Sequence, residues 1–158
     1  MTFLITNAVA ITMDDAHAIV RGSVGVIDGR IAFVGDVPPG HRATRFDETV
    51  DARGAYLLPG FVQTHLHLCQ TIFRSMADDL ALLEWLRTRV WPLEAAHDPR
   101  TLAGSARLAA AELLKGGTTS VLTMETVHGT EAVFDALEPT GLRATVGKCL
   151  MDADALAP

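Results

Sequence analysis

Two histidines that lie one residue apart, His65 and His67, are the residues whose types and spacing most clearly could do chemistry. They follow an apolar run that begins at Pro59-Gly60 and has the pattern of a β-strand. Because residues i and i+2 of a strand point to the same face, both imidazoles would project from one wall. Imidazole is the commonest neutral ligand for zinc or iron, so the spacing predicts part of a metal site. The alternative is a pair of half-buried histidines whose nitrogens are satisfied by backbone groups.

The composition is that of a folded protein suited to small-molecule chemistry. Of the 158 residues, 49% are hydrophobic and 20% are charged, which is typical of a globular chain. The net charge is -6 and no cluster of Lys or Arg occurs, so we expect no nucleic-acid partner. The N-terminus lacks a basic signal region, and no apolar stretch approaches the ~18 residues of a membrane span. We therefore expect no membrane association.

The cysteines indicate the compartment. Cys69 and Cys149 are far apart and outside any CxxC pattern, so they do not predict a disulfide framework. This favours a reducing cytoplasm over secretion. Both are expected to be small buried hydrophobes, not nucleophiles or ligands.

The first 58 residues have the alternating pattern of β-strands, with Gly, Asp and Pro between short apolar runs. They predict a small antiparallel layer. Within it, the segment 26–31 places Asp28-Gly29 between two apolar runs, which is a strong signal for a hairpin. A further strand is expected over 55–58.

From Pro59 onward, helical patterns alternate with short apolar strands. We expect Asp78 or Asp79 to cap a helix that stops near Pro92, and Asp98 to cap one that runs from Pro99 to Lys115. A strand should follow over 118–124, then a helix capped by Thr130 that runs to Leu137, then a strand over 142–151. The inner face of the helix that ends at Lys115 is predicted to consist of Leu102, Ala106, Ala109, Ala110, Leu113 and Leu114.

Strands that alternate with helices imply parallel strands joined by right-handed crossovers. Either a closed barrel or an open doubly wound sheet satisfies this pattern, and the periodicity does not choose between them. A complete eight-fold barrel takes ~250 residues, whereas this chain supplies about three of its strands. If the fold is a barrel, the chain holds a part of it.

Two longer segments resemble a known family. "VDARGAYLLPGFVQTHLHL" resembles the entry into the barrel of the amidohydrolase superfamily, and "IDGRIAFVG" resembles the hairpin of its N-terminal β-sandwich. The resemblance implies an α/β fold: part of a β-sandwich over 1–58, then the N-terminal part of a (β/α)8 TIM barrel over 59–158, incomplete in this chain. It also implies that His65 and His67 hold one divalent metal, zinc with iron as the alternative. The remaining ligands and the proton shuttle are expected beyond Pro158, so no catalytic residue is assigned within the chain.

The segment "RSMADDLALLEWLRTRVWPLE" is similar to the corresponding segment in deaminases of adenosine derivatives such as 5'-deoxyadenosine, methylthioadenosine and S-adenosylhomocysteine. This implies that Trp85 lines the nucleoside pocket and that Glu94 binds the ribose hydroxyls. A carboxylate suits that task, since its two oxygens can accept from both hydroxyls of a vicinal diol. The alternatives are core packing for Trp85 and a solvated acid in a first helical turn for Glu94.

At three positions the sequence resembles guanine deaminases instead. These are Gln70 after the His-x-His, His128 after the second barrel strand, and Lys148 at the third. Adenosine-type enzymes more often carry arginine at the position of Lys148. Triazine hydrolases share the His-x-His and Gln70. Each residue has a plainer interpretation: Gln70 capping a strand end, His128 on a surface loop, and Lys148 extending into solvent.

The expected reaction is hydrolytic deamination of a purine-like ring, in which a metal-bound hydroxide attacks the amino-bearing carbon. The expected partners are a small heterocyclic amine, the rest of the barrel as a second chain or a C-terminal part, and further copies in a homo-oligomer. The rival hypothesis is a non-catalytic fragment that needs a second chain. Parallel strands with unpaired edges favour association in either case.

Overall fold

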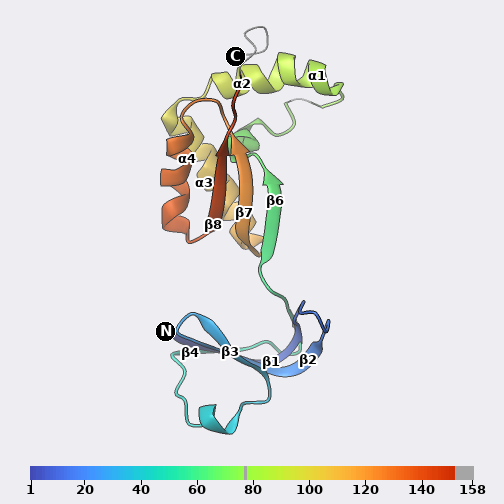
Figure 1. Ribbon diagram of the computed structural model, residues 1–158, viewed down its shortest axis with the longest axis vertical. Coiled ribbons are helices and arrows are strands. Elements are labelled where there is room, and N and C mark those ends of the chain that lie inside the picture. The colour runs from blue at the N-terminus through green and yellow to red at the C-terminus, as the bar shows by residue number, and fades with distance from the viewer. Residues whose placement is uncertain (77, 152–158) are drawn as a thin grey trace. The chain divides into compact units, whose positions relative to one another are not determined.

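The computed structural model describes residues 1–76 and 78–151, and the chain forms two compact units, Met1–Pro59 and Gly60–Pro158 (Figure 1). Each unit has a sheet of its own. None of the helices in the described part of the chain combines the length and apolar character needed to cross a membrane.

The first unit is a five-stranded sheet in the order β3-β2-β1-β4, with β5 also pairing with β1. Its strands are β1 (Thr2–Ile11), β2 (Ile19–Ile27), β3 (Arg30–Gly35), β4 (Glu48–Asp51) and β5 (Tyr56–Leu57). The sheet is mixed, because β4 and β5 run parallel to β1 while the other pairs are antiparallel. The prediction of an antiparallel layer is therefore wrong for these two strands. Residues 36–47, which include the short helix η1 (Pro39–His41), form a connection long enough to return the chain parallel to β1.

The hairpin within this sheet is confirmed. Ile27 pairs with Arg30, and the two residues between them, Asp28 and Gly29, have φ values of 51° and 73°. Positive φ at both central positions defines the type I′ turn, whose twist matches that of the flanking strands.

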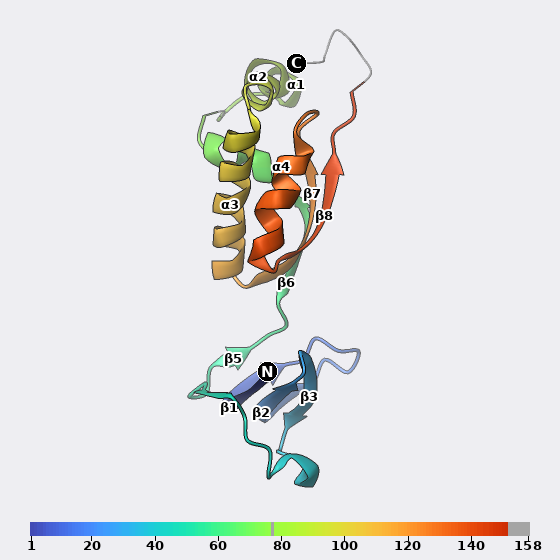
Figure 2. The ribbon, with the colours of Figure 1, turned by 90° about the vertical axis from the view of Figure 1, so that its left-hand side faces the viewer.

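The second unit contains three parallel strands in the order β6-β7-β8. They are β6 (Phe61–Leu66), β7 (Thr118–Glu125) and β8 (Arg143–Lys148). The helix α3 (Pro99–Lys115) leads into β7, α4 (Thr130–Leu137) and the short η4 (Glu138–Thr140) lead into β8, and both α-helices cover one face of the sheet (Figures 1 and 2). The predicted alternation of parallel strands and helices is confirmed. Beyond β6 the chain forms η2 (Leu68–Phe73).

The helix α3 begins and ends where the sequence predicts. The Asp98 side chain accepts from the Thr101 backbone N–H at 2.7 Å, and the Thr101 hydroxyl accepts from the Asp98 N–H at 3.0 Å. This reciprocal capping satisfies two N–H groups that the first turn cannot pair internally. Gly116 closes the other end.

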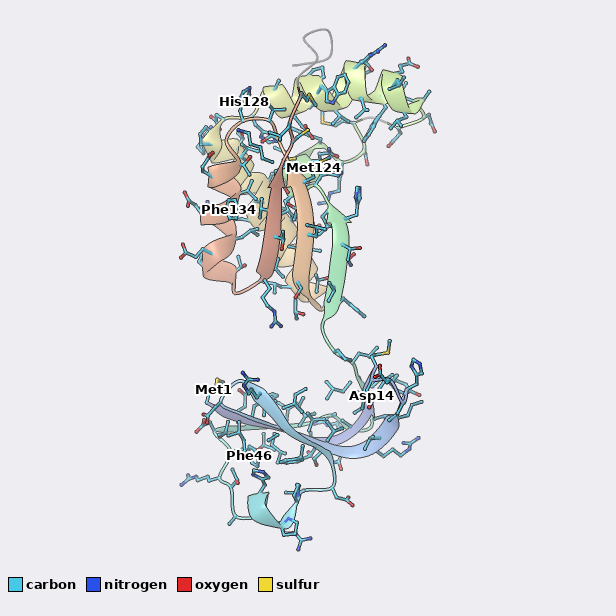
Figure 3. The ribbon with its side chains drawn as sticks, viewed as in Figure 1. Met1, Asp14, Phe46, Met124, His128 and Phe134 are labelled. Carbon is cyan, nitrogen blue, oxygen red and sulfur yellow. The ribbon has the colours of Figure 1, made fainter. Side chains whose placement is uncertain are left out.

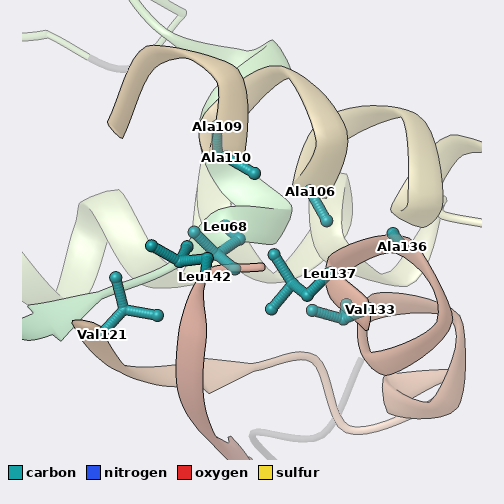
Figure 4. Packing of buried hydrophobic residues seen from close by; sticks show 9 residues of the cluster. All are labelled: Leu68, Ala106, Ala109, Ala110, Val121, Val133, Ala136, Leu137 and Leu142. Atoms are coloured by element: carbon teal, nitrogen blue, oxygen red, sulfur yellow. The ribbon is translucent and has the colours of Figure 1, made fainter. Parts of the chain in front are cut away.

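The core of the second unit lies between these helices and the sheet (Figure 4). Small residues of α3 bring its backbone close to α4 and to the sheet, and most of the predicted inner face is buried. Leu114 is an exception at 42% exposed, so its assignment to the core is wrong, and the fully buried Ser105 takes part instead. The buried cluster consists of Leu68, Ala106, Ala109, Ala110, Val121, Val133, Ala136, Leu137 and Leu142.

Two predicted helix boundaries are wrong. The helical stretch that starts at Leu82 is capped by Ala81, without a side-chain hydrogen bond, and not by Asp78 or Asp79. It passes through α1 (Leu82–Trp85), one π-helical turn (η3, Leu86–Val90) and α2 (Trp91–Ala95), so that Pro92 lies inside it.

The π turn explains why Pro92 is tolerated. The Trp91 N–H bonds to the Leu86 carbonyl five residues back, a widened turn that relieves the clash between a proline ring and the carbonyls of the preceding turn.

The predicted cap of α4 is also wrong, because Thr130 does not cap this helix. The residue before α4 is Gly129, in the left-handed region, and the Thr130 hydroxyl donates to the Thr126 carbonyl.

Candidate active site

His65 and His67 lie together at the carboxyl end of β6. Their ring centroids are 5.0 Å apart and the ring planes are nearly perpendicular, at 87°. Leu66, between them, packs against the helix-covered core, so by strand alternation His65 points to the uncovered face. His65 is exposed and His67 half-buried, so both rings have surface that a ligand can reach.

The ring of His67 is oriented by a backbone group. Its Nδ1 lies 2.7 Å from the carbonyl oxygen of Met124, near the end of β7 (Figure 3). A carbonyl only accepts, so Nδ1 must carry the proton, and the lone pair of Nε2 is left free. This is the arrangement that metal-binding histidines ordinarily show, and the pair fits a divalent metal. Zinc usually takes three or four protein ligands, and residues 1–76 and 78–151 contain no group of three or more His, Cys, Asp or Glu side chains placed to hold a metal.

The backbone that follows His67 is held by the carboxylate of Glu125, the last residue of β7. Its Oε1 accepts from the Leu68 N–H at 3.0 Å and its Oε2 from the Cys69 N–H at 2.8 Å. The Thr123 hydroxyl also donates to Oε1. Glu125 is only 2% exposed, and a buried carboxylate needs hydrogen-bond donors. These three donors meet that need.

The carbonyls of the same two residues are held from the opposite side. The Ser105 hydroxyl lies 2.7 Å from the Leu68 oxygen and 3.0 Å from the Cys69 oxygen. His97 Nε2 contacts the Cys69 oxygen at 2.9 Å, and its Nδ1 lies 3.0 Å from the Thr101 hydroxyl. Side chains from β7, from α3 and from the loop before α3 therefore fix one dipeptide immediately after the histidine pair.

Replacing Ser105 by alanine is expected to lower the free energy of unfolding by about 1–3 kcal/mol, because two buried carbonyls lose their hydroxyl donor. Denaturant unfolding of the variant measures this loss. Thr88→Ala, which removes an exposed hydroxyl that donates to the Glu84 carbonyl, is the control and should change the free energy of unfolding little. An unchanged midpoint for Ser105→Ala would show that the hydroxyl does not support the dipeptide.

A pocket of about 430 Å³ opens beside His67. Its lining comes from His67, from η2, from Arg74, Ser75 and Asp78 that follow η2, and from the helical stretch 82–95. It is lined in part by His67, Gln70, Phe73, Trp85, Val90 and Leu93. Trp85 is half-buried, so its ring contributes surface to the pocket and packing to the helix. The lining thus combines aromatic and apolar surface with several polar and charged groups, which can fix the orientation of a small molecule.

Gln70 connects this pocket to Glu94, which is half-buried and is not itself among the described lining residues. Gln70 Nε2 donates to Glu94 Oε1 at 2.7 Å, and the Cys69 thiol lies 3.7 Å from the same oxygen. Burial, reinforced by the carboxylates of Glu125 and Glu94, raises the pKa of the Cys69 thiol far above its ordinary value. Cys69 is fully buried, as predicted for a packing group, whereas Cys149 is only half-buried.

His128 and Lys148 are not brought into this arrangement. Both are exposed, and neither is among the described residues that line the pocket. His128 lies on the loop between β7 and α4, where its backbone carbonyl accepts from the Thr126 hydroxyl at 2.6 Å (Figure 3). Lys148 ends β8 and pairs in register with Glu125.

Glu125, Ser105 and His97 were not predicted from the sequence. Glu125 ends an apolar strand, and an acid at the carboxyl end of a barrel strand is a signal that could have identified it. Ser105 lies on the small-residue face of α3, where a buried hydroxyl must find a partner. His97 next to the helix cap Asp98 carries no comparable signal.

The comparisons with known proteins agree with this geometry. Residues 56–156 match the model of the amidohydrolase family. The chain is 37% identical over 150 residues to a 5'-deoxyadenosine deaminase of Methanosarcina acetivorans, covering 94% of this chain and 33% of that protein. It is 33% identical over 148 residues to a 5-methylthioadenosine/S-adenosylhomocysteine deaminase of Bacillus cereus, covering 91% and 34%. It thus spans about a third of the length of these curated relatives.

Solved structures show the same fold. A guanine deaminase from C. acetobutylicum with bound guanine superposes with a TM-score of 0.86 at 27% identity, covering 100% of this chain and 39% of that chain. An adenosine deaminase from Xanthomonas campestris with bound zinc gives 0.72 at 33% identity, covering 90% and 32%. A triazine hydrolase from Arthrobacter aurescens gives 0.83 at 24% identity, covering 98% and 37%, a likeness of fold alone.

Proposed function

Because the chain belongs to the amidohydrolase family, we propose that it supplies the first part of the active site of a metal-dependent hydrolytic deaminase. The proposed substrate is a purine nucleoside derivative such as 5'-deoxyadenosine, methylthioadenosine or S-adenosylhomocysteine. The observation that carries this proposal is the pocket beside His67, in which Gln70 and Trp85 take part and Gln70 is hydrogen-bonded to Glu94. The names of the relatives support the same substrate class.

His65 and His67 would hold one divalent metal, for which we propose zinc. The free Nε2 of His67 and the adjacent ring of His65 support this role. When bound, the metal supplies Lewis-acid activation of water for attack on the ring carbon that bears the amino group. The Met124 carbonyl keeps His67 in the tautomer that can bind the metal.

The pocket residues would bind and orient the nucleoside. The Trp85 ring offers a flat apolar surface against the base or the 5′ substituent. Glu94 would accept the ribose hydroxyls, and Gln70 holds one of its oxygens in place. A carboxylate that is fixed before binding loses less conformational entropy when the ligand arrives.

The remaining metal ligands and the proton shuttle are proposed to come from the rest of the barrel. This part would be a continuation of the same polypeptide or a second chain. In the described unit, β6 and β8 are the outer strands of the sheet, which is where further strands would add. The cysteines are free in the structure, which is consistent with the proposed cytoplasmic location.

Replacing Glu94 by alanine tests the substrate class. We expect kcat/KM for a 5′-modified adenosine to fall about 10- to 100-fold, the usual worth of hydrogen bonds to a charged group. The free base adenine has no ribose, so any turnover of it should change little. The assay uses the chain assembled with the rest of the barrel, and Glu84→Ala, an exposed acid on α1, is the matched control.

Guanine deamination is the second candidate, favoured by Gln70 in the pocket and by the likeness to the guanine deaminase structure. In that case Glu94 would hold Gln70 against the base and would not bind a ribose. Measurable guanine turnover that falls in Glu94→Ala, with no turnover of nucleosides in either protein, would replace the nucleoside proposal with this one.

A further inference from the structure

We propose that Glu125 is a positioning residue for the histidine pair: its carboxylate sets the backbone after His67 and thereby the direction of the His67 ring. This inference rests on the metal role proposed for His65 and His67. Glu125 is buried, is not among the described residues that line the pocket, and accepts its hydrogen bonds from backbone N–H groups and from Thr123, so it would act on His67 through the backbone.

The contacts place the last two residues of β7 against His67 in two ways. The Met124 carbonyl binds the His67 ring at Nδ1, at 2.7 Å. One residue on, the Glu125 carboxylate binds the N–H groups of Leu68 and Cys69, at 3.0 and 2.8 Å. The His67 ring and the backbone that follows it are therefore both held by hydrogen bonds to the last two residues of β7.

A carboxylate is the group that this geometry requires. The two N–H groups belong to consecutive residues, and one carboxylate offers each of them its own oxygen. An amide of the same shape would turn its NH2 group toward one of the N–H groups and leave two donors facing each other. Burying a charge is unfavourable unless donors surround it, and here the Thr123 hydroxyl is the third donor.

Glu125 also connects the ends of all three strands. Its side chain reaches the residues that follow β6, while its backbone carbonyl accepts from the Cys149 N–H just after β8, at 3.2 Å. The opposite side of the dipeptide is held by Ser105 from α3. A shift of the Glu125 side chain would thus be transmitted to the carboxyl edge of the sheet, where the histidines lie.

The test is Glu125→Gln in the 158-residue chain as it purifies, with 15N-labelled histidine and zinc as the only added probe. NMR of the ring nitrogens reports which nitrogen of His67 carries the proton, and a zinc titration followed on the same signals gives the affinity. We expect wild type to hold the proton on Nδ1, and the variant to show a mixture of tautomers. Zinc affinity should fall about 10-fold or more, as is typical when the support of a metal ligand is removed. Glu138→Gln, an exposed acid in the same unit, is the matched control and should change neither signal.

A folded Glu125→Gln protein with the wild-type tautomer and zinc affinity would overturn the proposal, even if its stability were lower. If the variant does not fold, Thr123→Val decides by the same two measurements, because it removes one donor to the carboxylate and preserves the side-chain shape. A wild-type chain whose His65 and His67 signals do not respond to zinc would contradict the metal role. The tautomer comparison would still decide whether Glu125 positions the His67 ring.

Discussion

Replacing His67 by asparagine is expected to reduce zinc affinity and deaminase activity by more than about 100-fold. Loss of a group that merely supports a metal ligand costs 10- to 100-fold, and loss of the ligand itself should cost more. Asparagine is chosen because its amide NH2 can reach the Met124 carbonyl much as the His67 Nδ1 does, while it has no counterpart of Nε2. The substitution therefore separates metal binding from the hydrogen bond that orients the side chain.

The comparison for His67→Asn uses thermal unfolding, zinc content and turnover of a 5′-modified adenosine by the chain assembled with the rest of the barrel. Unfolding should stay close to wild type, while zinc content and turnover collapse together. His17→Asn, the same change at an exposed histidine between β1 and β2 whose φ of 49° asparagine adopts readily, should leave all three unchanged. Turnover that survives in zinc-depleted His67→Asn would remove this residue from the site.

The second prediction is that the 158-residue chain does not by itself form a complete active site. The 158-residue chain alone is expected to show no enzyme-like deamination, and addition of the missing part of the barrel should restore a rate enhancement of ~10⁶-fold or more. The described residues hold two candidate ligands, and the sheet has open edges at β6 and β8. Large apolar residues of this sheet are also exposed: Phe61 and Val62 on β6, and Leu122 and Met124 on the central strand β7.

Restoration can be measured by co-expressing the chain with the polypeptide that follows the matched region in a relative, then assaying the assembled protein. The same polypeptide alone is the control. Tight assembly without activity would favour the rival hypothesis of a non-catalytic fragment. Deamination by the purified chain at full rate, with no second polypeptide present, would contradict the division of the site proposed for this protein.

Local features of the fold could be predicted because their causes lie within a few residues. The type I′ turn follows from Asp28-Gly29, and the start of α3 follows from Asp98, whose partner Thr101 is three residues away. The alternation of strands and helices in the second unit follows from the change in apolar period after Pro59. The parallel pairing of β4 with β1 could not be predicted in this way, since their partners lie 45 residues apart in the sequence.

The parts of the site that were not predicted also depend on contacts between residues far apart in the sequence. Glu125 binds Leu68 across 57 residues of sequence, and nothing near Glu125 indicates that partner. Pro92 predicts a helix end, but a π turn beside it lets the helix continue toward Glu94. The placement of His65 beside His67, by contrast, needs only the period of a strand. Ligand roles for these residues and substrate roles for Gln70, Trp85, Glu94, His128 and Lys148 stay predictions.

Intact mass and metal content of the purified protein, with a denaturing gel that shows every polypeptide present, test the histidine metal site most directly. We expect a larger polypeptide to accompany the chain when the remainder of the barrel is available, with close to one zinc per assembled pair. That zinc should be lost in His67→Asn. An assembled pair that contains no metal, or whose metal content is unchanged in His67→Asn, would contradict the proposed histidine metal site.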